Sequence, residues 1–266
     1  MDRFFVDAVY YSPTETSEKV AKVVAEGLET GFGEGRCAGV RYLDLTHGVP
    51  DGPVCIRDSV AVIAAPVYGG RVAETAVERL SGIRALNSAA VAVVLYGNRD
   101  YEDALAELQD LLETCGFRVA AAAAFIGEHS YSRPWMPIAE GRPDGRDLAK
   151  AKDFGAAAAG KLLAGKMPDG RLAVPGNRPY KIKGTHVPQA PVCDDSRCLG
   201  CGICASVCPV KAISLSSGKA VADNVSCTKC CACVKNCPAG ALVFDSPFAA
   251  ILYRDFSERK EPAIFL

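Results

Sequence analysis

The chain has 266 residues, of which 49% are hydrophobic and 23% are charged, so it can bury a large core and is not disordered. Its formal net charge of −1 gives no basic field for a phosphate backbone, which argues against nucleic-acid binding. No apolar run is long enough to span a membrane, and no export signal follows Met1, so we expect a cytoplasmic protein.

Short apolar runs alternate with segments of helical periodicity in the first 165 residues. Buried strands are expected at 4–10, 60–65, 91–96 and 119–126, with a weaker strand signal at 40–45. Between them, apolar residues recur three and four positions apart, which predicts helices at 17–32, 74–86, 101–115 and 147–163. This alternation indicates an α/β fold, a doubly wound parallel sheet with helices on both faces.

The composition changes at about residue 166. Residues 166–191 contain five prolines, five Lys or Arg residues and one Asp, and they lack periodicity, which predicts an extended basic linker. A cysteine-rich α+β module follows at 192–246, and its two halves repeat at a spacing of 29 residues. The tail, 247–266, is too apolar to be solvated, so we expect it to dock on the domains and bridge them. The alternative is a tail packed only on the module.

Cysteine is the unusual component, because ten of the 13 cysteines lie between residues 193 and 237. Without an export signal, a disulfide framework is disfavoured against metal ligation. Segments 198–209 and 227–238 each have the spacing C-x2-C-x2-C-x3-C-P of iron–sulfur proteins. Zinc is the alternative, but a zinc site uses four ligands and leaves the third cysteine and the trailing Cys-Pro without a role.

Three thiolates at this spacing can wrap one face of an iron–sulfur cube, and the fourth, before proline, ligates the other cluster of a two-cluster protein. The predicted ligands are Cys198, Cys201, Cys204 and Cys237 for one cluster, and Cys227, Cys230, Cys233 and Cys208 for the other. The module resembles bacterial-type ferredoxins with two 4Fe-4S clusters. Cys231 departs from the repeat, because Gly202 holds its place in the first copy. Cys231 is either a small side chain that fits the space at this position or a thiol that tunes the reduction potential of the nearby cluster.

The first strand leads into the first helix through a loop rich in hydroxyl groups. Hydroxyls and free backbone amides at a helix N-terminus form a neutral cradle for a phosphate dianion. The simpler alternative is that Thr16 or Ser17 only caps the helix. The candidate phosphate-binding residues are Ser12, Thr14, Glu15, Thr16 and Ser17.

Two more loops, 66–71 and 96–101, follow the third and fourth predicted strands, at the sheet edge where parallel sheets bind ligands. With these loops, the first 165 residues resemble a flavodoxin domain, which implies the strand order 2-1-3-4-5 and bound FMN. The family's usual glycine is Glu15 here, whose carboxylate would repel phosphate unless it points to solvent. The resemblance implies that Tyr68 and Tyr101 lie beside the flavin ring. The residues that it implies contact the flavin are Pro66, Val67, Tyr68, Gly69, Gly97, Asn98 and Tyr101.

Residues 127–135 leave the fifth predicted strand at the same edge and include His129 and the single tryptophan, Trp135. They could contact the flavin or the module, although plain loop packing is the favoured interpretation. Nicotinamide binding is disfavoured, because no G-x-G-x-x-G opens the first helix.

The whole chain is similar to fusions of a flavodoxin domain with a two-cluster ferredoxin. This resemblance implies an electron carrier that relays electrons between FMN and two 4Fe-4S clusters and on to redox partner proteins. One alternative is an FMN-dependent oxidoreductase that acts on a small substrate and receives electrons from the clusters. Another is a redox sensor whose flavodoxin-like domain binds no flavin and serves for docking.

Overall fold

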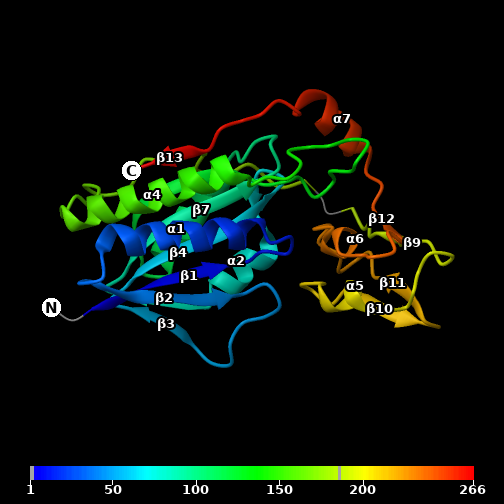
Figure 1. The fold of residues 1–266 in the computed structure, drawn as a ribbon, viewed down its shortest axis with the longest axis horizontal. Helices are drawn as coiled ribbons and strands as arrows, with labels where there is room; N and C mark the ends of the chain where they lie inside the picture. The colour runs from blue at the N-terminus through cyan, green and yellow to red at the C-terminus, as the bar shows by residue number, and fades with distance from the viewer. Residues whose placement is uncertain (1–2, 185–186) are drawn as a thin grey trace.

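Five parallel strands form the centre of the N-terminal domain in the computed structural model, which describes residues 3–184 and 187–266 (Figure 1). Each strand pairs in parallel with its neighbour, in the order β2-β1-β4-β7-β8. In terms of the five predicted strands this order is 2-1-3-4-5, so the flavodoxin-like doubly wound fold is confirmed. The strands are β1 (Phe4–Tyr10), β2 (Cys37–Asp44), β4 (Val60–Tyr68), β7 (Ala89–Tyr96) and β8 (Arg118–Ile126).

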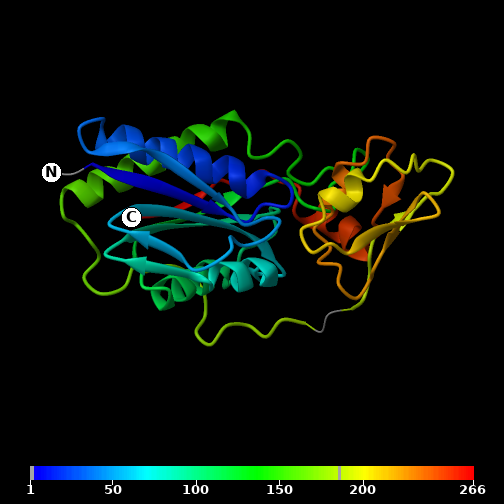
Figure 2. The same cartoon turned by 90° about the horizontal axis from the view of Figure 1, so that it is seen from below.

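Helices cover both faces of this sheet, as Figure 2 shows from below. The helices α1 (Thr16–Phe32) and α4 (Gly145–Leu163) pack on one face, and α2 (Glu74–Leu80) and α3 (Ala104–Thr114) on the other. Two hydrophobic cores result, one on each side of strands that are almost entirely buried. Among the described residues, no helix is both long and apolar enough to cross a bilayer.

Glycine allows α1 and α4 to pack in close contact. A Cβ on Gly27 would lie 2.2 Å from the carbonyl oxygen of Lys152, and a Cβ on Gly155 would lie 2.2 Å from that of Val24. Because both distances are far below van der Waals contact, the two backbones could not approach this closely with any larger residue.

Two predicted helices are shorter in the structure than in the sequence analysis. The helix predicted at 74–86 ends at Leu80, and Ile83–Leu86 form strand β6, which pairs in parallel with β3 (Val54–Arg57). Burial alternates along β6, which is the period of a strand and not of a helix. The helix predicted at 101–115 begins only at Ala104, because Glu102 has a positive φ of 40°.

Residues 171–183 of the predicted linker lie along α3 of the N-terminal domain and reach α2. Gln109 Nε2 donates to the carbonyl of Leu172 at 2.9 Å, and the carboxylate of Asp103 accepts from the backbone N–H groups of Asn177 and Lys181 at 2.7 Å each. The linker's cations pair with carboxylates of this domain: Arg178 with Asp110, Lys181 with Glu102, and Lys183 with Glu74. The linker is thus bound by both backbone and ionic contacts.

The cysteine-rich module consists of two antiparallel strand pairs and two single-turn helices beside the N-terminal domain (Figure 1). Strand β9 (Val192–Cys193) pairs with β12 (Leu242–Val243), and β10 (Ile213–Ser216) pairs with β11 (Lys219–Ala222). Helices α5 (Ile203–Ser206) and α6 (Ala232–Lys235) occupy equivalent places in the two halves of the repeat.

The tail returns to the N-terminal domain. After helix α7 (Pro247–Asp255), strand β13 (Ala263–Phe265) pairs antiparallel with β8 and covers that edge of the sheet. A short strand, β5 (Arg71–Val72), also joins the sheet through β4. The hydrogen bonds of the tail's second half reach residues of the N-terminal domain, including Asn98, Arg99 and Arg142. A tail packed only on the module is therefore wrong.

Candidate cofactor sites

A cavity of about 500 Å³ opens at the carboxyl edge of the sheet, where the N-terminal domain faces the module. This volume is within the range of about 300–1,000 Å³ that is typical of sites for small molecules and cofactors. Four loops of the N-terminal domain line it, together with the linker's Lys181, two residues of the module and two of α7. The lining includes Thr14, Thr16, Pro66, Val67, Tyr68, Gly69, Gly97, His129, Tyr131, Thr228, Lys229, Phe248 and Leu252.

The loop between β1 and α1 places its candidate phosphate-binding residues differently. The side chains of Thr14 and Thr16 border the cavity, whereas Ser12 Oγ accepts from the backbone N–H of Glu18 at 3.0 Å and so caps α1. Ser17 is fully buried, and its Oγ has no hydrogen-bond partner among the described residues. Ser17 itself does not line the cavity, so the features there that fit the phosphate of FMN are the hydroxyls of Thr14 and Thr16 and the N-terminus of the 17-residue helix α1.

Glu15 is the position at which the sequence departs from the flavodoxin pattern. Its φ is 62°, a left-handed conformation that suits the family's glycine and is uncommon for other residues. The carboxylate lies 3.3 Å from Lys19 Nζ and is 64% exposed, so it points to solvent and is partly neutralised. Repulsion of a phosphate by Glu15 is therefore weak in this geometry.

The candidate residues for the flavin ring only partly gather at the cavity. Tyr68, Gly69 and Gly97 line it, whereas Tyr101 does not and instead packs against Tyr96 with ring centroids 5.3 Å apart. Tyr68 is the aromatic candidate that remains at the wall. Burial raises its pKa well above the ordinary value, so it stays a neutral hydrogen-bonding group.

Asn98 holds the tail with its side chain. Its Nδ2 donates to the carbonyls of Phe256 and Glu258, at 2.5 and 2.7 Å. The residue is 1% exposed, has a φ of 68°, and does not line the cavity. The structure therefore places this amide at the junction between the β7 loop and the tail, and not at the polar edge expected for the flavin.

Residues 127–131 form a wall of the cavity, and Tyr131 and Arg133 contact Phe244 of the module, so plain loop packing is wrong for this segment. His129 packs against Gly97, where a Cβ would lie 2.2 Å from its ring, and its Nδ1 accepts from the backbone N–H of Tyr131 at 3.0 Å. Burial, with Lys235, Arg99 and Arg133 nearby, lowers the pKa of His129 to about 4. The imidazole is thus neutral near pH 7, with its remaining proton on Nε2.

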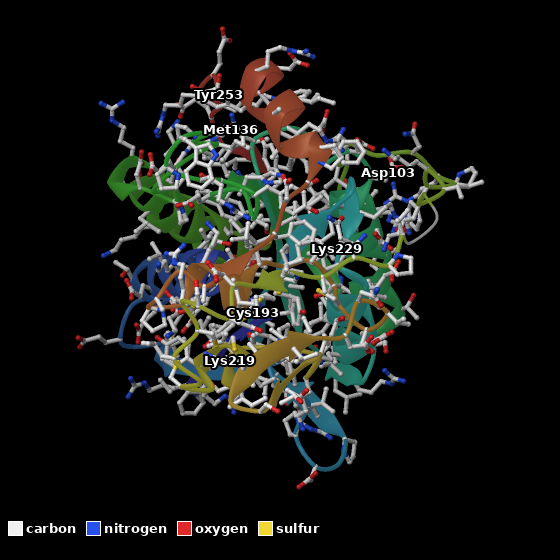
Figure 3. All side chains as sticks on the ribbon, turned by 90° about the vertical axis from the view of Figure 1, so that its right-hand side faces the viewer. Asp103, Met136, Cys193, Lys219, Lys229 and Tyr253 are labelled. Atoms are coloured by element: carbon white, nitrogen blue, oxygen red, sulfur yellow. The ribbon has the colours of Figure 1, made fainter. Side chains whose placement is uncertain are left out.

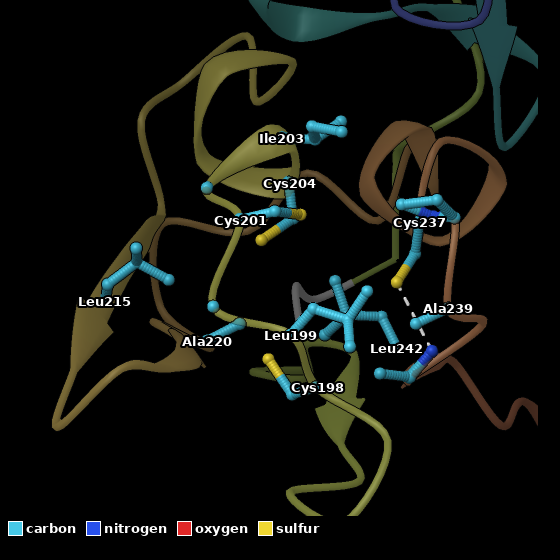
Figure 4. Close-up of a pocket in the computed structure, with 14 residues that line it drawn as sticks. Cys198, Leu199, Cys201, Ile203, Cys204, Leu215, Ala220, Cys237, Ala239 and Leu242 are labelled. Atoms are coloured by element: carbon cyan, nitrogen blue, oxygen red, sulfur yellow. Dashed lines mark hydrogen bonds between the residues drawn. The ribbon is translucent and has the colours of Figure 1, made fainter.

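Four cysteines from both halves of the repeat surround one small cavity in the module (Figure 4). Cys198, Cys201 and Cys204 come from the first motif, and Cys237 comes from the second. The sulfur of Cys237 accepts from the backbone N–H of Ala241 at 3.2 Å. Within residues 3–184 and 187–266, no three His, Cys, Asp or Glu side chains are close enough to hold a single metal ion. Thiols around a common space suit a cube of iron and sulfur.

The second set lies where the module meets the N-terminal domain. The thiolate charges of Cys208 and Cys227 act on Cys230, whose pKa burial raises to about 11, and all three act on Cys233. The sulfur of Cys208 accepts from the backbone N–H of Ala212 at 3.2 Å, as Cys237 does from Ala241 in the other half. Cys208 of the first motif is thus close to Cys227, Cys230 and Cys233 of the second, as the predicted exchange of fourth ligands requires.

Cys231 repeats the backbone of Gly202. Both residues precede a single-turn helix with a positive φ, 59° and 78° respectively. Cys231 is only 1% exposed, its thiol lies near Arg133, and burial raises its pKa to about 12. The position requires a left-handed backbone, for which glycine is the ordinary choice, so Cys231 adopts a locally strained conformation.

Three polar contacts and one aromatic contact join the two domains beside the second set. Arg79 Nη2 donates to the carbonyl of Pro209 at 2.7 Å, Arg133 Nη2 donates to that of Phe244 at 3.1 Å, and Lys235 pairs with Glu128. The rings of Tyr131 and Phe244 lie 5.1 Å apart. Figure 3 shows the molecule from the end at which the module lies, with the module in front of the N-terminal domain, Lys229 near the centre and Tyr253 of α7 above it.

Comparison with known proteins bears on both parts of the chain. Residues 194–214 match the family of the 4Fe-4S binding domain, and no curated protein matches the chain. The rubredoxin oxygen:oxidoreductase of Desulfovibrio gigas is similar at 16% identity and a TM-score of 0.41, covering 61% of this chain and 36% of its own. This chain therefore spans about a third of that protein. A flavodoxin from the domain Archaea is similar at 14% identity and a TM-score of 0.40, covering 60% of this chain and 99% of its own.

Proposed function

We propose that this chain is an electron-transfer protein that relays electrons between FMN and two 4Fe-4S clusters and on to redox partner proteins. The flavin supplies a centre that exchanges two electrons, and the clusters supply centres that exchange one. In this proposal residues 1–165 bind FMN and residues 192–246 bind the clusters. The linker, 166–191, and the tail, 247–266, hold the two domains together in the cytoplasm.

The residues of the cavity have separate roles in this proposal. The hydroxyls of Thr14, Thr16 and Ser17 bind the phosphate together with the N-terminal amides of α1. Tyr68 packs against the ring, and His129 donates from Nε2 without changing its charge near pH 7. Phe248 and Leu252 of α7 exclude water from one side of the cavity.

One observation carries the proposal: Thr228 and Lys229 line the flavin cavity, and both stand between the predicted ligands Cys227 and Cys230. The loop that would wrap the second cluster is thus itself a wall of the cavity. A free linker of 26 residues would span roughly 25–30 Å on average and leave the two sites uncoupled. The docked linker and the contacts of Arg79, Arg133 and Lys235 favour a fixed, short separation.

The test is anaerobic reconstitution with FMN, iron and sulfide, followed by analysis of the loaded chain. We expect eight iron atoms and one flavin per chain, and rapid bleaching of the flavin bands when a one-electron donor is mixed in. Cys230→Ser should slow this bleaching strongly, whereas Cys55→Ser, an exposed cysteine outside both motifs, should not.

Each alternative gives a different result in the same experiment. A chain that takes up clusters but no flavin would favour the sensor. Turnover of a small substrate at the rate of flavin oxidation, with no transfer to protein acceptors, would favour the oxidoreductase. Equal bleaching in the Cys230→Ser and Cys55→Ser proteins would contradict the relay.

A further inference from the structure

Four buried side-chain oxygens have no hydrogen-bond partner in the part of the chain that the structure describes. Two of them are Ser17 Oγ, at the start of α1, and Asn98 Oδ1, in the loop after β7, and neither residue lines the flavin cavity. The other two, Tyr11 OH and Thr228 Oγ1, lie beside the second cysteine set. A buried hydroxyl without a partner is unfavourable, so each of these groups points to a bound partner at its site.

Of the two residues beside the second cysteine set, Tyr11 is more buried than Thr228. It follows β1 directly, is 0% exposed, and its backbone N–H donates to the carbonyl of Ala64 at 3.1 Å. The guanidinium of Arg79 lies 5.4 Å from the ring centroid, and the same group donates to the carbonyl of Pro209, the neighbour of Cys208. Through Arg79, these contacts hold the Tyr11 ring of the N-terminal domain next to the cysteine module.

The surroundings of the Tyr11 hydroxyl contain the second cysteine set. Among the groups whose charges act on it are the thiolates of Cys230 and Cys208, one from each motif, and Thr75 lies nearby. A tyrosine hydroxyl keeps its proton near neutral pH, so the group is available as a donor. Phenylalanine would fill the same space without an unpaired oxygen, which makes the hydroxyl itself the feature that requires a partner.

We propose that the Tyr11 hydroxyl donates a hydrogen bond to a sulfur atom of the cluster held by Cys227, Cys230, Cys233 and Cys208, and that it raises the reduction potential of this cluster. A donor stabilises the reduced form more, because reduction adds negative charge to the cluster. The proposal rests on the second cluster of the proposed function. It makes Tyr11 a positioning residue that joins the cluster to the phosphate loop, since Ser12 follows it in the chain.

Tyr11→Phe tests this proposal, because it removes the oxygen and keeps the ring. In a redox titration of the loaded protein followed by electron paramagnetic resonance, we expect one of the two cluster potentials to fall and the other to stay. A tenfold change in that reduction equilibrium corresponds to about 59 mV for one electron. Tyr10→Phe is the matched control, because the neighbouring hydroxyl points to Glu18 at 3.4 Å, and it should leave both potentials unchanged.

A second measurement uses solvent exchange in the wild-type and Tyr11→Phe proteins. Transfer of the wild-type protein to D2O should remove an exchangeable proton coupling from the spectrum of one reduced cluster, and Tyr11→Phe should lack that coupling from the start. A wild-type protein with only four iron atoms per chain would contradict the second cluster of the proposed function. Eight iron atoms with unchanged potentials in Tyr11→Phe, or no exchangeable coupling, would instead overturn the role of Tyr11 and assign its hydroxyl to Thr75 or water.

Discussion

Arg79 Nη2 donates a hydrogen bond of 2.7 Å to the carbonyl oxygen of Pro209, the residue that follows Cys208. The other terminal nitrogen of the same guanidinium donates to the carbonyl of Leu45 at 2.7 Å. One side chain of α2 therefore ties the carboxyl edge of the sheet to the loop that carries a predicted cluster ligand. The orientation of the two domains depends on a small number of such contacts.

Arg79→Ala should loosen this junction. Hydrogen bonds from a charged donor contribute about 1.5–3 kcal/mol, so amide exchange at Lys211 and Ala212 should rise by roughly tenfold or more. Hydrogen exchange followed by mass spectrometry measures this. Arg84→Ala is the control, because within the described residues Arg84 Nη1 donates to carbonyls of its own turn, those of Ser81 and Ile83. Equal exchange in both variants would show that Arg79 does not hold the module.

Close packing of α1 and α4 gives a second prediction, on stability. Gly155→Ala should destabilise the N-terminal domain by about 1–3 kcal/mol, because the new Cβ would overlap the carbonyl of Val24. Gly160→Ala, on the same helix, meets no atom within 4 Å and should stabilise it by roughly 1 kcal/mol through helix propensity. Urea denaturation followed by circular dichroism measures both. The same sign of change in the two variants would contradict this account of the packing.

The phosphate cradle gives a third prediction. Ser17→Ala removes a buried, unpaired oxygen and should weaken FMN binding by about tenfold, while the stability of the flavin-free protein is unchanged or increased. Glu15→Gly should change the Kd little, because its carboxylate points to solvent beside Lys19. Quenching of flavin fluorescence measures both affinities. A large gain in affinity from Glu15→Gly would mean that the carboxylate does repel the phosphate.

Local sequence patterns predicted the sheet well because its strands are buried on both faces and read as continuous apolar runs. Even the alanines at 120–124 form a strand, since β7 and β13 supply its partners. The cysteine sets were predicted from their spacing alone. This was possible because three ligands of each motif lie on one tight loop, so that their arrangement depends on the local sequence. The error at 74–86 arose where an apolar period of a helix changes within a few residues to the period of β6.

Long-range contacts account for what the sequence could not predict. The flavodoxin resemblance assigned Asn98 to the flavin, but its amide contacts the tail 158 residues away. Strand β13 has only three residues, so its pairing depends on the exposed edge of β8 and not on its own pattern. Residues 127–131 line the cavity because the segment that follows β8 meets the module. The local sequence of this segment does not predict that contact.

The buried His129 gives a prediction on pH. Its folded pKa of about 4 is lower than the ordinary 6.5, so the unfolded chain binds more protons between these values. Stability should therefore fall as pH decreases from about 6.5 towards 4, with His129 as one contributor. His129→Gln should reduce this slope, whereas His47→Gln, at an exposed position, should leave it unchanged. Anaerobic urea denaturation between pH 5 and 7 measures the slope, and parallel curves for all three proteins would contradict the prediction.

Deletion of residues 257–266 tests whether the tail holds the relay together. The deletion removes β13, the acceptor carbonyl of Glu258 for Asn98, and the pair between Arg259 and Asp144. The edge of β8 would then be open, so backbone amides near Ala123 should exchange faster. Loss of the Glu258 contact should also free the loop of Gly97 at the cavity wall, and reduction of the flavin through the clusters should slow while both cofactor spectra remain.

Arg254→Ala is the control for the deletion, because this exposed residue pairs with Asp255, its neighbour in α7. An unaltered transfer rate in the truncated protein, with faster exchange at β8, would show that the tail protects the sheet edge without holding the two domains in their electron-transfer geometry.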